Sequence, residues 1–465
     1  MSINNIANYF KSQVKKEEWA PLIWSFLYFY FLLTSYFVVR PIRETMGVTA
    51  GGREIYDVLF SATFIVMLLL QPVYGKIVSK YSRKQFIPII YGFFTVLMII
   101  FWATFQKFGT ENITLAKVYF VFVSVFNLFV VSVFWSFMAD VYNKEQGKRL
   151  FGVIAAGGST GGISGGIITS VLVERIGTIN MMLVSAGFLI VCILIVIKIR
   201  KYANESTVNK EAPLGGSPLE GLKLTFSSKL LTQMAIMTVM AVLIGGIFYT
   251  LQGEYIRQNY ADKDTQTAIF ANVNTFTNML TLFFQLILTP FLLQKIKIHK
   301  ILGIYPTIMI FAFIVFGAVP VLQIVLAGII LQRSGAYGLM KPPTDWLFTG
   351  LDKNIKYKFK NFMDTVIYRG GDVFTQLVFI NAVSYFTKSL RVFAVFGVRF
   401  SLIWLVNAIT VGRLAHQAFL TQSNSSNFKS SKYIMHWENV FHVYLFSNSN
   451  NNQSKSYETT VTFCY

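Results

Sequence analysis

The chain has 465 residues, of which 54% are hydrophobic and only 13% are charged, and it contains 45 Phe residues. Soluble proteins carry about 25% charged residues, so two or three soluble domains of this total length would lack the surface charge that keeps them dissolved. The composition therefore excludes a soluble protein and indicates a chain that crosses a membrane many times.

The apolar residues fall in twelve blocks, each long enough to cross a bilayer as a helix. About 30 Å of hydrocarbon requires roughly 20 apolar residues in a helix. The runs are continuous, which excludes the alternating pattern of membrane strands. We therefore predict an all-α membrane fold of twelve transmembrane helices, with spans at 21–40, 56–78, 86–106, 117–139, 151–173, 179–199, 230–251, 267–292, 300–319, 321–340, 363–386 and 391–412.

The net charge of +20 is explained by topology. Basic residues gather in alternate connections, at 76–84, 144–149, 198–229, 295–300 and 341–360. By the positive-inside rule these connections are cytoplasmic, which places both termini inside. A nucleic-acid partner would need a basic face with interleaved aromatic residues, and the sequence shows none.

The longest polar interruption, at 200–229, divides the spans into six and six. Two six-helix halves with a long middle loop are the plan of the major facilitators, which build their site between the halves and rock one half against the other. The predicted parts are a cytoplasmic segment 1–20, a first half 21–199, a central cytoplasmic loop 200–229, a second half 230–417 and a polar tail 418–465.

The tail is rich in Ser and Asn and holds His436 and His442, two of the four His residues of the chain. One interpretation is a disordered cytoplasmic tail. The other is a shifted reading frame, because the composition changes abruptly after Gln417. Neither interpretation gives the tail a role in transport.

The connection between the second and third spans, Gly75-Lys-Ile-Val-Ser-Lys-Tyr-Ser-Arg83-Lys, resembles the cytoplasmic loop motif of the major facilitators. Gly75 would permit close helix approach, and the cations, Arg83 among them, would meet helix C-termini. The simpler alternative is an ordinary basic loop on the inner side.

The sequence contains no motif that predicts an enzyme. It has no G-x-x-x-x-G-K-[ST] and no H-E-x-x-H. The pattern G-x-S-x-G occurs around Ser159 and Ser164, but within a helical span and not at a strand-turn-helix junction. The two Cys residues have no metal-binding spacing. We therefore expect no catalytic residues, no metal and no cofactor, so that uphill work would draw on a gradient or on exchange.

The fifth span contains the glycine-rich stretch GGSTGGISGG at 157–166. Its glycines repeat every four residues in two rows, which lets a neighbouring helix approach to backbone contact and slide. The stretch resembles the antiporter signature of the major facilitators, and a phosphate-binding loop is the alternative, although no Lys follows. The two rows are Gly157, Gly161 and Gly165, and Gly158, Gly162 and Gly166.

Ionisable residues inside spans cost about 2.5–3.5 kcal/mol on insertion scales, so each one predicts a functional site. Pro41 should bend or end the first helix near two of them. Alternatives are snorkelling of Arg40 and Arg43, structural pairs of the later arginines with Asp372, and plain interhelical bonding by Asn127. The candidate substrate-binding residues are Arg40, Arg43, Glu44, Asn127, Glu254, Tyr255, Arg333, Arg369 and Asp372. Because Arg exceeds acids here and suits phosphate or carboxylate, the substrate is predicted to be a small anion.

Four stretches resemble the bacterial branch of the ATP/ADP translocases, the nucleotide-exchange family, with a likeness that runs from about residue 20 to 417. They are VVRPIRETMGVTAGG (38–52), FWSFMADVYNKEQGKRLFGVIAAGGSTGG (134–162), GEYIRQNYADKD (253–264) and KYKFKNFMDTVIYRGGDVF (356–374). The resemblance implies exchange of ATP for ADP or similar nucleotides across a bacterial inner membrane.

The resemblance also implies site residues. Arg43 stands where the family has a cation that contacts phosphate. The family's acid in the fourth span is replaced by apolar residues near Val123, and its cation in the eleventh span aligns with Asp372, with Arg369 one turn earlier as the substitute.

The sequence thus predicts a secondary transporter that exchanges a nucleotide-type anion by alternating access. A proton-coupled transporter of another small anion is the alternative, and a non-transporting membrane receptor or assembly factor is a second one. The expected partners are the solute and the lipid bilayer, without nucleic acid; the oligomeric state stays open.

Overall fold

The computed structural model describes residues 14–80, 83–202, 218–349, 359–360, 362–387 and 389–424, and these residues form helices without any strand. The all-helical prediction is confirmed. The α-helices of the first part are α2 (Trp19–Thr49), α3 (Tyr56–Lys80), α4 (Arg83–Phe108), α5 (Ile113–Val141), α6 (Lys144–Ile176) and α7 (Met181–Ile199), with 3-10 turns η1 (Lys16–Glu18), η2 (Gly52–Glu54) and η3 (Arg200–Tyr202).

The second part of the chain contains interrupted helices. Its α-helices are α8 (Pro218–Thr225), α9 (Lys229–Asn259), α10 (Lys263–Phe283), α11 (Thr289–Lys295), α12 (Ile298–Ala318), α13 (Leu322–Gly335), α14 (Lys341–Thr349), α16 (Tyr368–Phe374), α17 (Asn381–Phe386) and α18 (Val392–Asn424). Four π-helical segments join some of them: η4 (Phe284–Leu288), η5 (Ala336–Met340), η6 (Met363–Ile367) and η7 (Thr375–Ile380).

The helices account for the predicted membrane spans. Ten helices of the described chain are long and apolar enough to cross a bilayer, and a shorter apolar helix covers Tyr56–Leu70 in the second predicted span. The eleventh predicted span is the helical run of η6, α16, η7 and α17. The prediction of a twelve-helix membrane fold therefore holds.

The first helix is longer than predicted. The expectation that Pro41 ends the first helix is wrong, because α2 continues through Pro41 to Thr49; the alternative, a bend at Pro41, stays a prediction. Proline removes a backbone donor inside a helix. The carbonyl of Pro41 itself accepts a 3.2 Å bond from the hydroxyl of Thr45. Arg40, Arg43 and Glu44 consequently lie within the helix and not after it.

The chain divides into two compact units. The first unit takes its described residues from Met1–Lys210 and Gly253–Met279, and the second takes them from Glu211–Gln252 and Leu280–Val461. The boundaries predicted at 199, 229 and 417 stay predictions.

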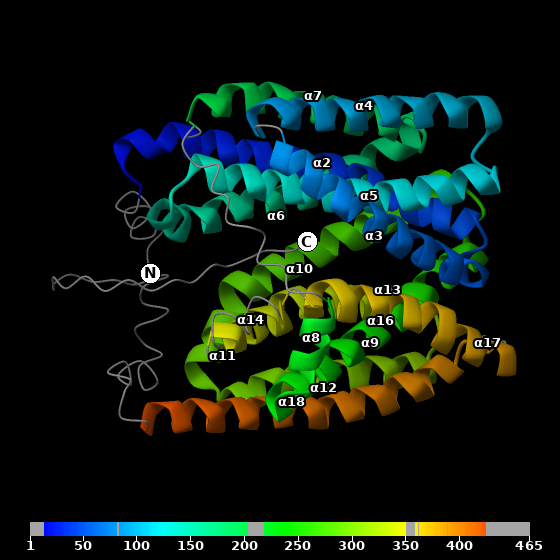
Figure 1. Ribbon diagram of the computed structural model, residues 1–465. Coiled ribbons are helices and arrows are strands. Elements are labelled where there is room, and N and C mark those ends of the chain that lie inside the picture. The colour runs from blue at the N-terminus through cyan, green and yellow to red at the C-terminus, as the bar shows by residue number, and fades with distance from the viewer. Residues whose placement is uncertain are drawn as a thin grey trace. The chain divides into compact units, whose positions relative to one another are not determined.

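In the first unit, α2 packs on α6, α7 and α5, while α4 packs on α7 (Figure 1). Aromatic side chains fill this core: the ring of Phe29 stacks on that of Phe134 at 4.2 Å, and Tyr28 meets Phe134 edge-on at 4.8 Å. These three residues are fully buried. The high Phe content of the sequence therefore serves close packing of long helices.

In the second unit, α12 and α18 run side by side along most of their length (Figure 1). Phe248 of α9 stacks on Phe313 of α12 at 4.4 Å. Phe248 also lies against Gly328 of α13, where there is no space for a Cβ. One aromatic ring thereby connects three helices of this unit.

Some predicted features lie outside the described residues. Tyr81 and Ser82 of the loop motif, most of the central loop and the tail from residue 425 belong to them. Gly75 is part of α3, and Arg83 is the first residue of α4. The roles predicted for these two residues stay predictions.

Candidate substrate-binding residues

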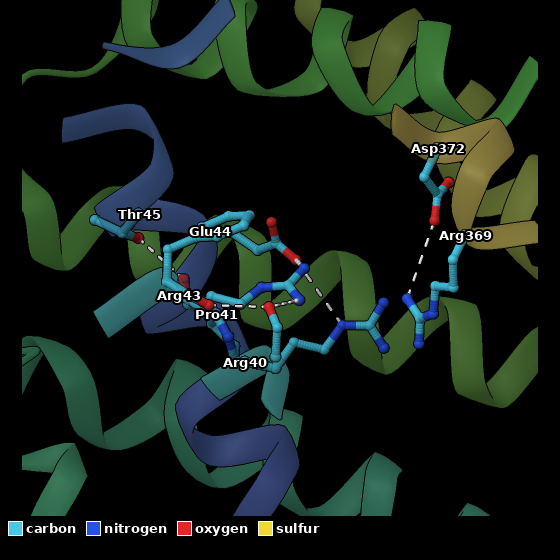
Figure 2. A network of polar contacts seen from close by, with 9 residues as sticks. Arg40, Pro41, Arg43, Glu44, Thr45, Arg369 and Asp372 are labelled. Atoms are coloured by element: carbon cyan, nitrogen blue, oxygen red, sulfur yellow. Dashed lines mark hydrogen bonds and ion pairs between the residues drawn. The ribbon is translucent and has the colours of Figure 1, made fainter. Parts of the chain in front are cut away.

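The second half of α2 carries two arginines that share one buried carboxylate. Nη2 of Arg43 donates a 2.7 Å hydrogen bond to Oε1 of Glu44, and Nε of Arg40 lies 4.0 Å from the same oxygen. The side chain of Glu44 is 2% exposed, against 21% for Arg40 and 15% for Arg43. Figure 2 shows the three side chains side by side on the helix. Two cations therefore meet one anion at this point.

Helix α5 holds the second side of Arg43. Nη1 of Arg43 donates a 3.1 Å bond to Oγ of Ser124, and the guanidinium lies 4.8 Å from the centre of the Phe120 ring. Phe120, Ser124 and Asn127 follow one another at helical spacing, so they share one face of α5. Asn127 therefore lies on the helix face that contacts Arg43, one turn further along.

Several buried polar atoms of the first unit have no hydrogen-bond partner in the part of the chain that the structure describes, and three of them belong to predicted site residues or lie against the glycine rows. These three are Nε of Arg40, Oδ1 of Asn127 and Nδ2 of Asn278 in α10. Buried polar groups are nearly always bonded to protein or water, because leaving one unsatisfied costs about 1–3 kcal/mol. The three atoms are therefore available to a polar solute or to water.

The predicted site residues at the end of α9 are held by their own helix. Oε1 and Oε2 of Glu254 accept bonds of 3.0 and 3.2 Å from Arg257, and Gln258 donates a further 2.8 Å bond to Oε1. The backbone carbonyl of Tyr255 accepts a 2.8 Å bond from the amide of Asn259. The partners of Glu254 described here, Arg257 and Gln258, thus come from the next turn of the same helix.

Tyr56 of α3 lies near both groups of charges in the first unit. Its side chain is 1% exposed. It interacts electrostatically with Glu44 and Arg43 of α2 and with Glu254 and Arg257 of α9. This tyrosine was not predicted from the sequence, and it brings the α2 charges and the α9 charges into one polar region.

The later arginines belong to the second unit. The guanidinium of Arg333 in α13 lies 5.9 Å from the centre of the Tyr249 ring in α9. Nη1 of Arg369 is 4.0 Å from Oδ2 of Asp372 on α16 (Figure 2), and their side chains are 38% and 23% exposed. The expected pair of Arg369 with Asp372 is therefore present, but it is long and open compared with the pair on α2.

Buried amides complete the polar region of the second unit. Gln376 of η7 is 2% exposed; its Oε1 accepts a 3.1 Å bond from Thr250, and its Nε2 donates a 3.5 Å bond to the carbonyl of Gly246. The side-chain amide of Gln332 packs against Gly245: a methyl group added to Gly245 would lie only 2.9 Å from Nε2 of Gln332. Glycines of α9 therefore make room for amides from α13 and η7.

Spacing relative to the ionisable residues could have revealed these amides. Gln376 follows Asp372 by one helical turn, and Gln332 directly precedes Arg333. Ser124 gives no such signal, because nothing in the sequence connects it with Arg43.

The first glycine row of α6 lies against the backbone of α2. Added methyl groups on Gly157 and Gly165 would come within 2.6 and 2.7 Å of carbonyl oxygens of α2. The row Gly157, Gly161 and Gly165 faces the carbonyl oxygens of Phe26, Tyr30 and Thr34 in turn. The two helices therefore touch through backbone atoms along three turns.

The second glycine row lies against side chains. Gly158 faces the ring of Phe29, and a methyl group on Gly162 would come within 2.8 Å of Nδ2 of Asn278. At Gly166 it would come within 3.0 Å of the carbonyl oxygen of Ala271 in α10. Helix α6 thus meets the backbone of α2 along its first row, while its second row meets side chains of α2 at Gly158 and Gly162 and meets α10 at Gly162 and Gly166.

Two π-helical segments of the second unit bind each other. Gln285 of η4 donates a 3.1 Å bond to the carbonyl of Tyr337 in η5, and Thr289, at the start of α11, donates a 2.5 Å bond to the carbonyl of Gly338. A π-turn breaks the regular backbone pattern and frees carbonyl oxygens. Side chains of one irregular helix therefore satisfy the freed carbonyls of the other.

An apolar helix bundle whose spans contain partly exposed arginines, buried carboxylates and buried amides is the arrangement of a membrane transporter. No group of three His, Cys, Asp or Glu residues in the described chain is placed to hold a metal ion. The model of the Major Facilitator Superfamily matches residues 22–348, and the chain belongs to this superfamily. It is an integral, multi-pass membrane protein.

Solved transporter structures share the fold. The POT family transporter PepTSo has a TM-score of 0.63 at 11% identity, covering 86% of this chain and 98% of its own. A point mutant of the nucleoside transporter NupG has a TM-score of 0.57 at 13% identity, covering 86% and 100%. A bacterial homologue of the iron transporter ferroportin gives 0.56 at 12% identity, covering 85% and 98%. No curated protein sequence matches the chain. At these identities the structures show the fold alone.

Proposed function

We propose that this transporter exchanges an organic anion of nucleotide type, such as ATP for ADP, by alternating access. It acts as a carrier without enzymatic chemistry. The proposed orientation has both termini on the cytoplasmic side of a bacterial inner membrane, which follows from the placement of the basic connections. The four stretches that resemble the ATP/ADP translocases support nucleotides as the substrate class.

The observation that carries the proposal is the carboxylate of Glu44 shared by Arg40 and Arg43. A charge removed from water needs an opposite charge beside it, and here one buried acid serves two partly exposed guanidinium groups. The shorter contact belongs to Arg43, while Arg40 stands at 4.0 Å and its Nε has no hydrogen-bond partner among the described residues. A phosphate that enters this region completes the coordination of Arg40 without first breaking a strong pair.

Arginine suits this role because its planar fork binds phosphate through two parallel hydrogen bonds. Arg43 is oriented by Glu44, Ser124 and the Phe120 ring, so little side-chain entropy is lost when it binds a ligand. Asn127, on the same face of α5, adds an acceptor oxygen for a hydroxyl or an amino group of the solute.

The second unit contributes a similar set. Arg333 lies over Tyr249, and Arg369 is loosely paired with Asp372. We propose that these two arginines bind further anionic groups of the solute, and that Asp372 releases Arg369 when the anion is bound. The glycine rows of α6 support the rocking step, because helix surfaces without side chains can slide past each other with no interdigitated side chains to separate.

The test is counterflow in proteoliposomes with radiolabelled ATP. Exchange predicts uptake only when the vesicles are loaded with unlabelled nucleotide. Arg43→Glu is expected to lower uptake at least 100-fold, because charge reversal puts two acids beside the bound phosphate. Arg43→Lys should keep a fraction of it. The matched control is Arg175→Glu, at the exposed end of α6, which should leave uptake unchanged.

Other outcomes identify other functions. Uptake that follows a pH step and needs no internal nucleotide would identify a proton-coupled transporter of an anion. Tight binding without flux would identify a receptor on a carrier fold. Normal counterflow by Arg43→Glu would contradict the assignment of Arg43.

A further inference from the structure

The outer surface of the second unit has a groove between α12 and α18. Its volume is about 680 Å³. Both helices belong to one unit and lie against each other along their length (Figure 1). The groove is lined by His299, Lys300, Gly303, Ile304, Thr307, Ile308, Phe311, Leu405, Ile409 and Arg413.

One end of the groove is apolar. Gly303 forms part of its floor, since a methyl group there would meet the side chain of Leu405 at 3.3 Å. Phe311, which lines this end, is 63% exposed. Large apolar side chains exposed on a membrane-spanning surface face hydrocarbon. This end of the groove therefore opens towards the acyl chains of the bilayer.

The other end of the groove is basic. Lys300 and Arg413 are exposed there, and His299 lies between the two helices, where its backbone touches the position of Gly412. Among the described residues, the largest electrostatic effects on the His299 imidazole come from Arg413, Lys300, Lys297 and His416. All of them are basic. The charge at this end is therefore of one sign.

The first turn of α12 adds to this potential. Its N-cap residue, Lys297, makes no side-chain hydrogen bond to the turn. The N-terminus of a helix carries a partial positive charge and donor N–H groups that favour phosphate. At this one place the helix end, Lys300 and Arg413 all favour an anion, and the apolar groove begins beside them.

We propose that this groove binds an anionic glycerophospholipid, with the phosphate at Lys300 and Arg413 and an acyl chain along Ile304, Ile308 and Phe311. The charge selects an anionic headgroup, because the positive choline of a zwitterionic lipid would stand near Lys297 and His416. The apolar length selects a lipid over a soluble phosphate. The site is separate from the arginines proposed for transport and does not depend on the transported substrate.

Native mass spectrometry of the whole protein in detergent tests the proposal. Dioleoyl phosphatidylglycerol should bind at least tenfold more tightly than dioleoyl phosphatidylcholine. The double variant Lys300→Gln/Arg413→Gln should lose this preference. Lys198→Gln/Arg200→Gln, at the exposed end of α7, removes the same charge elsewhere and should keep it.

A second variant tests the apolar end. Ile308→Trp fills the groove and leaves every cation in place, so it should weaken phosphatidylglycerol binding about tenfold while the protein stays monodisperse. Lys300→Gln/Arg413→Gln and Ile308→Trp both alter the outer surface of the unit. If the double variant does not fold, the single variant Arg413→Gln replaces it in the test.

Three results would overturn the proposal. One is an unchanged lipid preference in Lys300→Gln/Arg413→Gln or in Arg413→Gln. Another is binding of soluble glycerol 3-phosphate as tight as that of the lipid, since the groove would then contribute nothing. The third is a dimer that Ile308→Trp dissociates, which would identify a second copy of the chain as the occupant.

Discussion

The two units differ in the regularity of their helices. In the first unit, α6 approaches α2 through glycines at every fourth position, so regular helices touch along their backbones. In the second unit, four π-helical segments interrupt the helices, and side chains such as Gln285 and Thr289 bind the carbonyls of a neighbouring helix. The described residues of the first unit contain no π-helical segment.

This difference separates two solutions to one problem. Inside a bilayer every backbone polar group must be satisfied within the protein. Regular helices meet this requirement internally, and glycine rows then bring them close together. Irregular helices leave carbonyls for side chains to bind, which makes their contacts specific but dependent on single hydrogen bonds. We therefore expect the glycine row of the first unit to be sensitive to added volume and the π-helical segments of the second unit to be sensitive to lost polar partners.

The largest effect should come from adding volume to the first unit. In Gly161→Ala the new methyl group would overlap the carbonyl oxygen of Tyr30, which the backbone of α2 cannot easily move. We expect loss of most folded protein, measured by monodispersity and thermal unfolding in detergent.

The control for this variant is in the same helix. Gly152 has no heavy atom near the position of an added Cβ. Gly152→Ala should therefore leave stability unchanged or raise it by about 0.5–1 kcal/mol through helix propensity. Equal behaviour of the two alanine variants would contradict the backbone contact of the glycine row.

The next largest effect should come from the ion pairs, and it should differ between units. Glu44→Gln removes the buried carboxylate that lies 2.7 Å from Arg43 and 4.0 Å from Arg40, and because both arginines are only partly exposed the cost should approach about 3 kcal/mol. Asp372→Asn removes the partner of Arg369 at 4.0 Å, where both side chains are partly exposed. That loss should be about 1 kcal/mol or less. A larger loss of melting temperature in Asp372→Asn than in Glu44→Gln would reverse this ranking.

A smaller effect should come from the paired π-segments. Thr289→Val keeps the shape of the side chain and removes its bond to the carbonyl of Gly338. The free energy of unfolding should fall by about 1–3 kcal/mol, because that carbonyl is left unsatisfied.

Thr410→Val is the control for this variant, since the Thr410 hydroxyl bonds only to Val406 O of its own helix in the contacts described. It should change the melting temperature little. If both valine variants behaved alike, the bond between the irregular helices would contribute nothing measurable.

The smallest effect concerns the start of α10. Oδ2 of Asp262 accepts 2.7 Å bonds from the backbone N–H and the hydroxyl of Thr265, and these bonds lower the pKa of the Asp262 carboxyl. Asp262→Ala should cost about 1 kcal/mol at pH 7. The pKa of the Asp262 carboxyl is lower in the folded protein than in the unfolded chain, where it is near 3.9. The carboxylate therefore stabilises the fold fully above about pH 3.9, and this stabilisation is lost as the pH falls through the pKa of the folded protein.

The measurement is thermal unfolding of wild type and variant between pH 7 and pH 3, where the difference should shrink in acid. Asn112, which caps α5 through a 3.0 Å bond from Leu115 N, gives the control. The cost of Asn112→Ala should not change with pH, because the amide does not titrate. A constant cost for Asp262→Ala would exclude the carboxylate as the stabilising group.

The fold was largely predictable, because span length and basic connections are local properties of the sequence. The continuation of the helix through Pro41 was not, since the rule for proline describes an isolated helix, whereas in the folded chain α2 runs on to residue 49. The π-segments gave no signal either: the glutamine and threonine that stabilise η5 come from a helix about 50 residues away.

The candidate site was predictable in its charges and not in its partners. Arg40, Arg43 and Glu44 stand out as ionisable residues in an apolar setting, and the structure places them in contact. Ser124, Phe120 and Tyr56 were missed, because ordinary hydroxyl and aromatic residues acquire a role only through the neighbours that the fold supplies.

Helix α9 has a consequence for attempts to cut this protein in two. It is continuous from Lys229 to Asn259, yet the boundary between the compact units falls inside it, after Gln252. A fragment that stops in the central loop would lack residues 253–279 of its own unit, including Glu254 and Thr267. Thr267 bonds to both Thr45 and Thr178, so such a fragment would leave these hydroxyls without that partner. Co-expressed halves would have to reassemble by exchanging this segment, and a break at the natural-looking linker would not yield two autonomous pieces.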